Sequence, residues 1–124
     1  MTATKIEPVK VLIIEDEGEM CLLLELLLNN KTTSLTHVKS LAAAKEFLQA
    51  EIPSIVLLDN RLPDGLGIDF LAFLKANYPT VKIIMITGAD KAAKDIALEN
   101  GADEFLNKPF TKVELSNSIQ RLMN

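Results

Sequence analysis

Cysteine, histidine and tryptophan are nearly absent from this chain, which has one cysteine, one histidine and no tryptophan in 124 residues. The single cysteine, Cys21, excludes an internal disulfide and a cysteine metal cluster, and it suits a reducing cytoplasm. The single histidine, His37, falls in an expected strand, away from the acidic cluster described below. We therefore expect His37 to be a strand residue and not a metal ligand.

Long apolar runs and an excess of positive charge are also missing. No apolar stretch approaches the roughly 20 residues that cross a bilayer, and residues 1–5 lack the apolar core of a signal peptide. The net charge of −4 argues against nucleic acid as the direct ligand. There is no long linker, low-complexity block or exact repeat. The sequence therefore predicts one cytoplasmic domain with no direct contact to a membrane or nucleic acid.

A strand-then-helix rhythm that occurs five times fills most of the chain, and the 48% hydrophobic and 5% aromatic content fits a compact α/β protein. Residues 1–8 form a polar tail. Apolar runs closed by turn residues predict strands, and a period of 3.6 predicts helices. We expect strands at 9–14, 34–38, 55–58, 81–86 and 104–106. We expect helices at 18–30, 41–50 with Ser40 as N-cap, 67–78, 91–100 with Gly101 as its stop, and 111–123.

Short connections between these elements predict a parallel sheet with helices on both faces. The natural arrangement is a flavodoxin-like, doubly wound (βα)5 fold with strand order 2-1-3-4-5. Ligands of such sheets bind at the carboxyl ends of the strands, beside the switch point between the first and third strands. Asp59 stands at the end of the third strand, so we expect it at the edge of that crevice.

Polar side chains follow four of the expected strands: Glu15 and Asp16 after the first, Asp59 after the third, Thr87 after the fourth and Lys108 after the fifth. Three carboxylates at one place would raise one another's pKa, and a divalent cation relieves this. Oxygen donors without histidine or cysteine suit Mg²⁺ or Mn²⁺. With a lysine and a hydroxyl opposite, the set fits phosphoryl transfer to an aspartate, which forms an acyl phosphate.

The chain resembles the receiver domain of bacterial two-component response regulators from about Val9 to Met123, so the expected organisation is a tail at 1–8 and a receiver domain at 9–124. The resemblance rests on four segments that together are highly specific: Ile14-Glu15-Asp16-Glu17, Leu58-Asp59 with Leu62-Pro63-Asp64-Gly65, Thr87-Gly88, and Gly101 to Phe110.

The resemblance implies a role for each of these residues. Asp59 would be the phosphoacceptor. Asp16 would bind Mg²⁺ directly and Glu15 through water, and the backbone carbonyl of Arg61 would complete the protein's share of the metal shell. Thr87 would bond a phosphoryl oxygen, and Lys108 would pair with the phosphoryl group or with Asp59. Phe105 would be the switch aromatic, turning inward as Thr87 moves.

Partners are implied by the same resemblance. The phosphodonor would be a sensor histidine kinase or a histidine phosphotransfer protein, and the output would reach a downstream protein, an effector domain or a second copy in a homodimer. The domain would catalyse its own phosphorylation and dephosphorylation without being a conventional turnover enzyme. The chain is either a stand-alone receiver or a piece of a longer regulator.

Two positions depart from the family pattern. Phe105 stands where many receivers have tyrosine, so no switch hydroxyl is available, and Asn60 is polar where an apolar residue is common. Neither removes a catalytic group. Both bear on the geometry of the active state.

Three other functions compete with this interpretation. A flavin-binding protein of the same fold needs a glycine- and hydroxyl-rich phosphate loop after the first strand, where this chain has Glu15-Asp16-Glu17. A small-molecule phosphatase needs a second acid and a substrate pocket. A non-phosphorylated interaction module does not need the complete set of Asp59, Asp16, Thr87 and Lys108.

The loops around Asp59 carry two further expectations. A cis peptide bond is expected at Lys108-Pro109, as the resemblance implies. The resemblance also implies that Arg61 and Ala89 border the attacking water. Because Ala89 has no group to orient this water, we expect slower self-dephosphorylation than in a receiver with an acidic or amide side chain at that position.

Two further expectations concern the surface. The resemblance implies an output face on the fourth helix, the fifth strand and the last helix, which should carry the mixed charges of Lys91, Lys94, Glu99, Asp103, Glu104 and Arg121. In the first helix, Met20, Leu23, Leu24, Leu27 and Leu28 form a stripe that should pack on the sheet. Leu22 should then be largely exposed and Leu26 partly so. These two are either ordinary surface leucines or the centre of a contact with a kinase helix bundle or a second copy of the domain.

Overall fold

Parallel strands make a central sheet, and its three inner strands are apolar runs of the sequence. The structure, a computed structural model, describes residues 9–28, 33–88 and 91–123. The elements in chain order are β1 (Val9–Ile14), α1 (Gly18–Leu28), β2 (Thr33–Val38), α2 (Leu41–Ala50), β3 (Ile55–Asp59), β4 (Arg61–Leu62), β5 (Gly65–Leu66), α3 (Gly67–Asn77), β6 (Lys82–Thr87), α4 (Lys91–Glu99), β7 (Glu104–Asn107) and α5 (Lys112–Met123).

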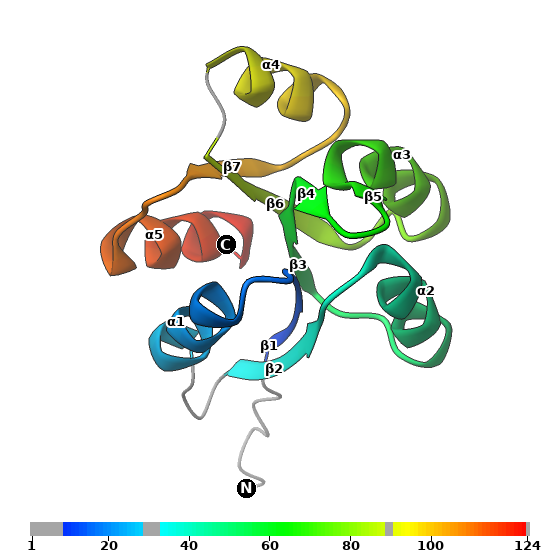
Figure 1. The fold of residues 1–124 in the computed structure, drawn as a ribbon, viewed down its shortest axis with the longest axis horizontal. Coiled ribbons are helices and arrows are strands. Elements are labelled where there is room, and N and C mark those ends of the chain that lie inside the picture. The colour runs from blue at the N-terminus through cyan, green and yellow to red at the C-terminus, as the bar shows by residue number, and fades with distance from the viewer. Residues whose placement is uncertain (1–8, 29–32, 89–90, 124) are drawn as a thin grey trace, which may run out of the picture.

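The sheet has the order β2-β1-β3-β6-β7 and all its pairings are parallel (Figure 1). With β6 and β7 counted as the fourth and fifth strands, this is the predicted 2-1-3-4-5 arrangement of a flavodoxin-like fold. Every residue of β3 is buried, as expected for a central strand that helices cover on both faces. The edge strand β2 is only partly buried.

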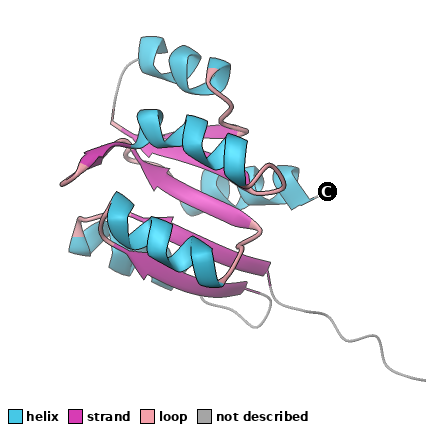
Figure 2. Ribbon diagram, turned by 90° about the vertical axis from the view of Figure 1, so that its right-hand side faces the viewer, coloured by secondary structure: helices cyan, strands magenta, loops and turns pink. Residues whose placement is uncertain are grey.

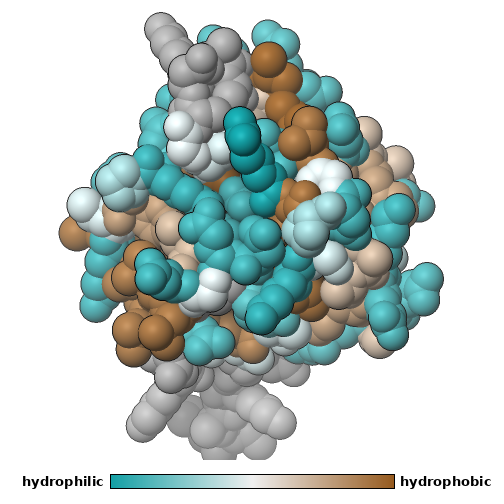
Figure 3. All heavy atoms as spheres, in the orientation of Figure 1, coloured by the Kyte–Doolittle hydropathy of each residue, from teal (hydrophilic) through white to brown (hydrophobic). Residues whose placement is uncertain are grey.

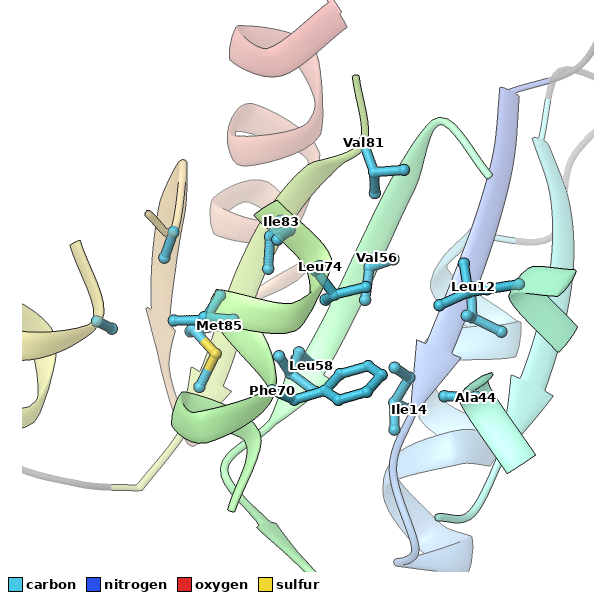
Figure 4. Packing of buried hydrophobic residues seen from close by; sticks show 14 residues of the cluster. Leu12, Ile14, Ala44, Val56, Leu58, Phe70, Leu74, Val81, Ile83 and Met85 are labelled. Carbon is cyan, nitrogen blue, oxygen red and sulfur yellow. The ribbon is translucent and has the colours of Figure 1, made fainter. Parts of the chain in front are cut away.

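Helices cover both faces of the sheet: α1 and α5 lie on one face, and α2, α3 and α4 lie on the other (Figures 1 and 2). Strand residues alternate between the two resulting cores. Leu12, Val56 and Leu58 face α2 and α3, where Phe70 and Leu74 pack against them (Figure 4). Their neighbours in the sequence face α1 and α5; these are Val11, Ile13, Ile55 and Leu57, packed with Leu24, Leu28 and Leu115.

Most of the predicted boundaries are confirmed to within one residue. Ser40 is the N-cap of α2, with its hydroxyl accepting from the Ala43 N–H at 3.1 Å. Gly101, after α4, has a φ of +108°, which favours glycine as a helix stop. The strands β2, β3 and β7 and the helices α3, α4 and α5 differ from the prediction by one residue at one end, and β6 by one residue at both ends. The predicted end of the first helix, 29–30, lies outside the described residues.

The loop after Asp59 contains secondary structure that was not predicted from the sequence. Residues Arg61–Leu62 and Gly65–Leu66 pair as a small antiparallel hairpin, β4-β5. A hydrogen bond from Gly67 N to the Asn60 carbonyl, 2.7 Å long, closes its base. Only the tertiary structure reveals this pairing, because strands of two residues leave no periodic pattern in the sequence.

Helix α1 packs on the sheet through a narrower stripe than its leucines predicted. Leu24 and Leu28 are buried and Met20 and Leu27 pack at their side, but Leu23 is 39% exposed, contrary to the prediction. Leu22 is 58% exposed, as predicted. Leu26, expected to be only partly exposed, is 73% exposed and thus more open than Leu22. Leu23 lies at the edge of the apolar stripe, so the part of the stripe that packs is narrower than predicted.

Among the described residues, every helix is too short or too polar to cross a lipid bilayer.

Candidate functional site

Parallel strands bring the predicted polar residues to one edge of the sheet. Asp59 is the last residue of β3 and Thr87 the last of β6. Glu15 and Asp16 follow β1, and Lys108 follows β7. Hydrophilic residues accordingly fill the middle of the face shown in Figure 3, which has the orientation of Figure 1. The arrangement matches the crevice expected at the switch point of a doubly wound sheet.

Three carboxylates form one acidic cluster at this edge. An oxygen from each of Glu15, Asp16 and Asp59 lies within 4.8 Å of the others. Glu15 is 2% and Asp59 5% exposed, whereas Asp16 is open to solvent. Two buried carboxylates and one exposed one give an oxygen-only donor set with an approach from solvent. Such a set suits a hard divalent cation.

Lys108 supplies positive charge to the cluster. Its Nζ donates to Glu15 Oε2 at 3.1 Å and to Asp59 Oδ1 at 3.3 Å, and it lies 3.7 Å from Glu17 Oε1. Burial alone would lower the pKa of Lys108, but the hydrogen bond to Glu15 and the charges of Asp59 and Glu15 outweigh it and raise the pKa above 10.5. The peptide bond Lys108-Pro109 is cis, as predicted.

Hydrogen bonds fix both the backbone and the side chain of Glu15. Its backbone N–H donates to the Val38 carbonyl at 3.1 Å, and its Oε1 accepts from the Glu17 N–H at 3.0 Å. Burial raises the pKa of Glu15 above 4.5, with the charge of Asp59 adding to the rise. The hydrogen bonds from Glu17 and Lys108 oppose it. The ionised form of Glu15 is therefore less stable here than in water, and a nearby cation would stabilise it.

His37 does not lie away from this region, contrary to the prediction. It is a strand residue of β2, as expected, and it is not one of the clustered carboxylate ligands. However, its Nε2 lies 2.7 Å from the backbone oxygen of Glu15. No local pattern in the sequence indicates this contact, because residues 15 and 37 become neighbours only when β1 and β2 pair.

Asn60, the unusual polar residue after Asp59, caps helix α3. Its Oδ1 accepts from the Ile68 N–H at 3.0 Å, while the N-cap position itself, Leu66, makes no side-chain cap bond. Gly67 lets the helix begin close to the strand: a Cβ there would lie 2.2 Å from the Asp59 carbonyl oxygen. Sequence reasoning missed both roles. An amide followed within seven residues by a helix-starting glycine was the available signal.

The hairpin β4-β5 carries Arg61 and is tied to α2. The carboxylate of Asp64 accepts from the Leu41 N–H and the Ala42 N–H, each at 2.9 Å. These two bonds hold the pKa of Asp64 below 3.8. A Cβ on Gly65, where φ is +153°, would come within 2.9 Å of Leu41 Cδ1. The loop that presents the Arg61 carbonyl is therefore docked on the N-terminus of a helix.

A hollow of about 360 Å³ opens over Asp59. It is lined by Glu17, Asp59, Asn60, Arg61, Thr87, Gly88 and Lys108. Thr87 is buried at its wall. Phe105, predicted as the switch aromatic, is partly buried against the core on the α2 and α3 side of the sheet. Ala89 lies outside the described residues.

Three of the six charged residues of the expected output face, Asp103, Glu104 and Arg121, form ion pairs within the chain. Arg121 Nε donates to Glu104 Oε1 at 3.1 Å. Asp103 Oδ2 accepts from Lys75 Nζ at 3.2 Å and from the Ile83 N–H at 2.8 Å. Lys94 and Glu99 are exposed, and the side chain of Lys91 lies outside those described. Asp103 is thus a structural residue as well as part of this surface.

Comparison with known sequences gives a consistent result. A family model, the response regulator receiver domain, matches residues 11–120. Response regulator protein PilR of Pseudomonas aeruginosa is 35% identical over 101 residues, 81% of this chain and 23% of PilR. Transcriptional regulatory protein BasR of Escherichia coli is 34% identical over 115 residues, 92% of this chain and 52% of BasR. The chain thus spans about half the length of BasR and a quarter of that of PilR.

Solved structures that resemble this chain are also receiver domains. The beryllofluoride-activated NtrC4 receiver domain dimer has a TM-score of 0.86 at 30% identity, over 91% of this chain and 94% of that one. A CheY-like receiver domain protein from Methanospirillum hungatei has a TM-score of 0.86 at 24% identity, over 94% and 95%. At that identity the second likeness supports the fold alone.

Proposed function

Because this chain belongs to the response regulator receiver domain family, we propose that it accepts a phosphoryl group on Asp59 from a phosphohistidine donor in a two-component phosphorelay. The observation that carries the proposal is the environment of Asp59. Its carboxylate lines a hollow, 3.3 Å from Lys108 Nζ and beside two other carboxylates. Residues 9–124 make up the proposed receiver domain and residues 1–8 a tail.

The proposed cofactor is Mg²⁺, with Mn²⁺ as a substitute. Asp16 and Asp59 bind it directly in this proposal, Glu15 through water, and Arg61 through its backbone carbonyl. The acidic cluster supports the assignment, because it contains only oxygen donors and Glu15 is destabilised in its ionised form. When bound, the cation would neutralise charge on the phosphoryl oxygens and the carboxylates.

The chain's own residues carry the transfer. A carboxylate oxygen of Asp59 attacks phosphorus, an O–P bond forms, and the electron pair of the broken N–P bond stays on the donor imidazole nitrogen. Lys108 keeps its positive charge beside the reacting oxygens, because its pKa is raised. The Thr87 hydroxyl donates to a phosphoryl oxygen. These contacts position the group and balance its charge, which is most of what phosphoryl transfer requires.

Hydrolysis then resets the domain. Water attacks the acyl phosphate, inorganic phosphate leaves, and Asp59 returns to its carboxylate. Each cycle consumes one phosphodonor and changes the protein's own state, so we propose a self-modifying switch and not a conventional turnover enzyme. The reaction belongs in the cytoplasm, where the phosphohistidine donors implied by the family act.

The proposed readout links Thr87 to Phe105. When Thr87 engages the phosphoryl group, Phe105 turns toward the space that Thr87 leaves. This changes the surface of α4, β7 and α5, which would meet a downstream protein, an effector domain or a second copy. The internal pairs Glu104–Arg121 and Lys75–Asp103 compete with charged contacts across a dimer. Sedimentation with and without beryllofluoride tests this; an unchanged distribution contradicts a homodimer switch.

The upstream partner is a sensor histidine kinase or a histidine phosphotransfer protein. We propose that the exposed leucines of α1, Leu22 and Leu26, lie in the contact with its helices. Both open to solvent on one side of the helix, and Figure 3 shows hydrophobic residues gathered over the region of α1. Fully burying one leucine is worth roughly 1.5–3 kcal/mol.

The decisive experiment is labelling by a small acyl-phosphate donor. Acetyl phosphate with Mg²⁺ should add one labile phosphoryl group to the wild type, seen in the intact mass, and none to Asp59→Asn. Asp69→Asn, an exposed aspartate on α3, is the matched control and should label like the wild type. Labelling of Asp59→Asn, or none of the wild type, contradicts the proposed function. It also excludes two of the alternatives, since neither a flavin protein nor a non-phosphorylated module would label.

A further inference from the structure

The side chain of His37 reaches from the edge strand β2 to the backbone beside the acidic cluster. β1 and β2 pair in parallel, with Ile13 opposite His37 and Ile14 opposite Val38. Figure 1 shows the two strands side by side at the edge of the sheet. The His37 Nε2 lies 2.7 Å from the Glu15 carbonyl oxygen. Because a carbonyl oxygen only accepts, Nε2 carries a proton and donates it.

That carbonyl belongs to the peptide group that joins Glu15 to Asp16. A hydrogen bond to this oxygen fixes the plane of the peptide, and the plane sets the direction in which the Asp16 side chain leaves the backbone. Glu15 is buried, so its own packing holds it in place. Asp16 is exposed, so side-chain packing constrains it much less. The backbone before Asp16 is therefore what aims its carboxylate at Asp59.

A second hydrogen bond between the same strand and Glu15 helps to fix the position of the Glu15 backbone. The Glu15 N–H donates to the Val38 carbonyl at 3.1 Å. This bond continues the ladder between β1 and β2 and requires no particular side chain. The bond from His37 lies one residue earlier on β2 and depends on a side-chain donor of the right reach. The strand therefore holds Glu15 at both its N–H and its C=O.

We propose that His37 is a positioning residue for the divalent cation site: its Nε2–H holds the Glu15–Asp16 peptide so that the Asp16 carboxylate joins those of Glu15 and Asp59. The inference rests on the proposed function, since it concerns the cation that phosphoryl transfer would use. His37 acts through the backbone and touches no reacting atom. Its loss should therefore weaken cation binding without lowering the rate of phosphoryl transfer at saturating cation.

Two substitutions separate the donor from the bulk of the ring. His37→Phe keeps a flat ring and removes the N–H, whereas His37→Gln keeps a side-chain N–H at a similar reach. Binding of Mn²⁺ to the full chain, followed through the electron paramagnetic resonance signal of free Mn²⁺, needs no phosphorylation. Partners that orient ligands typically contribute 10–100-fold to metal affinity. We expect the Kd to rise about tenfold for His37→Phe and to be restored to within about twofold by His37→Gln.

Labelling by acetyl phosphate gives an independent readout. For His37→Phe, the Mg²⁺ concentration at half-maximal rate should rise by the same factor as the Kd, while the rate at saturating Mg²⁺ stays near that of the wild type. A merely structural role would lower the maximal rate or the thermal midpoint instead. The control is Thr36→Ala on the same strand, whose side chain alternates to the opposite face of the sheet. It should leave Mn²⁺ affinity unchanged.

Clear results would overturn the inference. Wild-type affinity in His37→Phe shows that the hydrogen bond does not matter, and equal weakening in His37→Phe and His37→Gln shows that ring shape and not the donor is responsible. If His37→Phe does not fold, His37→Met, which also lacks an N–H, takes its place with the same expected result. A wild type that binds no Mn²⁺ contradicts the proposed function itself and this inference with it. A wild type that binds and labels, beside variants that do so equally well, contradicts this inference alone.

Discussion

Asn60 shows how one residue can depart from a family pattern without loss of the site. It stands between the proposed phosphoacceptor and the hairpin β4-β5, where an apolar side chain is common. Its amide oxygen accepts from the Ile68 N–H, and its backbone carbonyl accepts from the Gly67 N–H. Helix α3 has no cap from its own N-cap residue, Leu66, so the polar residue satisfies a helix end that would otherwise lack a partner.

The first prediction, at the scale of a single residue, concerns Ala89. It lies two positions beyond Thr87, and its methyl group offers nothing that orients a water molecule. Ala89→Glu adds a carboxylate that can accept a proton from the attacking water, so we expect self-dephosphorylation to accelerate roughly tenfold. Loss of the phosphoryl group over time, followed in the intact mass after removal of the donor, measures the rate.

The matched control for this prediction is Ala89→Leu, which changes size but adds no acceptor. It should dephosphorylate at the wild-type rate or more slowly. Ala89→Glu at an unchanged or lower rate would show that water positioning at this residue does not limit hydrolysis.

At the scale of elements, helix α1 contains more leucines than pack against the rest of the fold. The sheet and α5 bury Leu24 and Leu28, while Leu22, Leu23 and Leu26 remain exposed. Isolated surface leucines are normal, and three on adjoining turns of one helix form a patch. Glu19 and Glu25 lie on the same helix and are exposed as well. The patch therefore suits a partner helix that combines apolar and basic residues.

The second prediction tests this patch with Leu22→Glu combined with Leu26→Lys. We expect wild-type folding and wild-type labelling by acetyl phosphate, because neither side chain contributes to the buried core. Phosphotransfer from a protein donor, measured as the initial rate at limiting donor, should fall at least about tenfold. That factor corresponds to about 1.4 kcal/mol of lost contact.

Ile52→Glu is the control for the leucine patch. Its side chain is 57% exposed, close to the 58% of Leu22, but it lies in the connection between α2 and β3. It should leave phosphotransfer unchanged. An unfolded double variant would mean that α1 is buried on both sides. A folded variant with wild-type phosphotransfer and self-association would mean that the leucines are bystanders.

The third prediction concerns the docking of hairpin β4-β5 on α2. Two side chains cap this helix: Ser40 bonds the Ala43 N–H, and Asp64 bonds the Leu41 and Ala42 N–H groups. Ser40→Ala should cost about 0.5–2 kcal/mol of stability and leave Mn²⁺ affinity unchanged. Asp64→Ala should lower the thermal midpoint and also weaken Mn²⁺ binding, because it frees the loop that carries the Arg61 carbonyl.

The Asp64 contribution also has a defined pH dependence. Its pKa is lower in the folded protein than the ordinary value of 3.8. The stabilisation by Asp64 is thus present above pH 3.8 and is lost as the pH falls through the folded pKa. The difference in thermal midpoint between wild type and Asp64→Ala should therefore shrink below this pH. A difference that grows on acidification would contradict the assigned bonds.

At the scale of the whole molecule, the acidic cluster weakens the fold that presents it. Burial raises the pKa of Glu15, so at neutral pH its ionised form costs the folded state free energy that the unfolded chain does not lose. Lys108 compensates in part through its bonds to Glu15 and Asp59. A bound cation would offset the remaining free-energy cost of the buried, ionised Glu15.

The fourth prediction follows from this balance. Glu15→Gln should raise the thermal midpoint of the protein in chelator, because it removes the buried charge while Oε1 can still accept from the Glu17 N–H. Saturating Mg²⁺ should raise the midpoint of the wild type more than that of the variant. Calorimetry with and without Mg²⁺ measures both. A variant less stable than the wild type in chelator would show that the bond to Lys108 outweighs the burial of Glu15.

The sequence by itself determined the fold and the composition of the site. Alternation between apolar strands and amphipathic helices depends on local periodicity, so β1, β3, α2 and the strand order followed from the chain alone. Asp59, Thr87 and Lys108 were found because the ends of parallel strands meet at one edge of a sheet. This rule needs only the positions of the residues along their own strands.

Tertiary structure decided whatever depends on contacts between distant segments. The bond from His37 to Glu15 requires β1 and β2 to be paired, and the bond from Asp64 to Leu41 requires the hairpin to reach α2. The exposure of Leu23 and Leu26 depends on how much of the α1 surface the rest of the fold covers. A periodic pattern records which side of a helix is apolar, but how much of that side is covered is set by the shape of the surface it packs against.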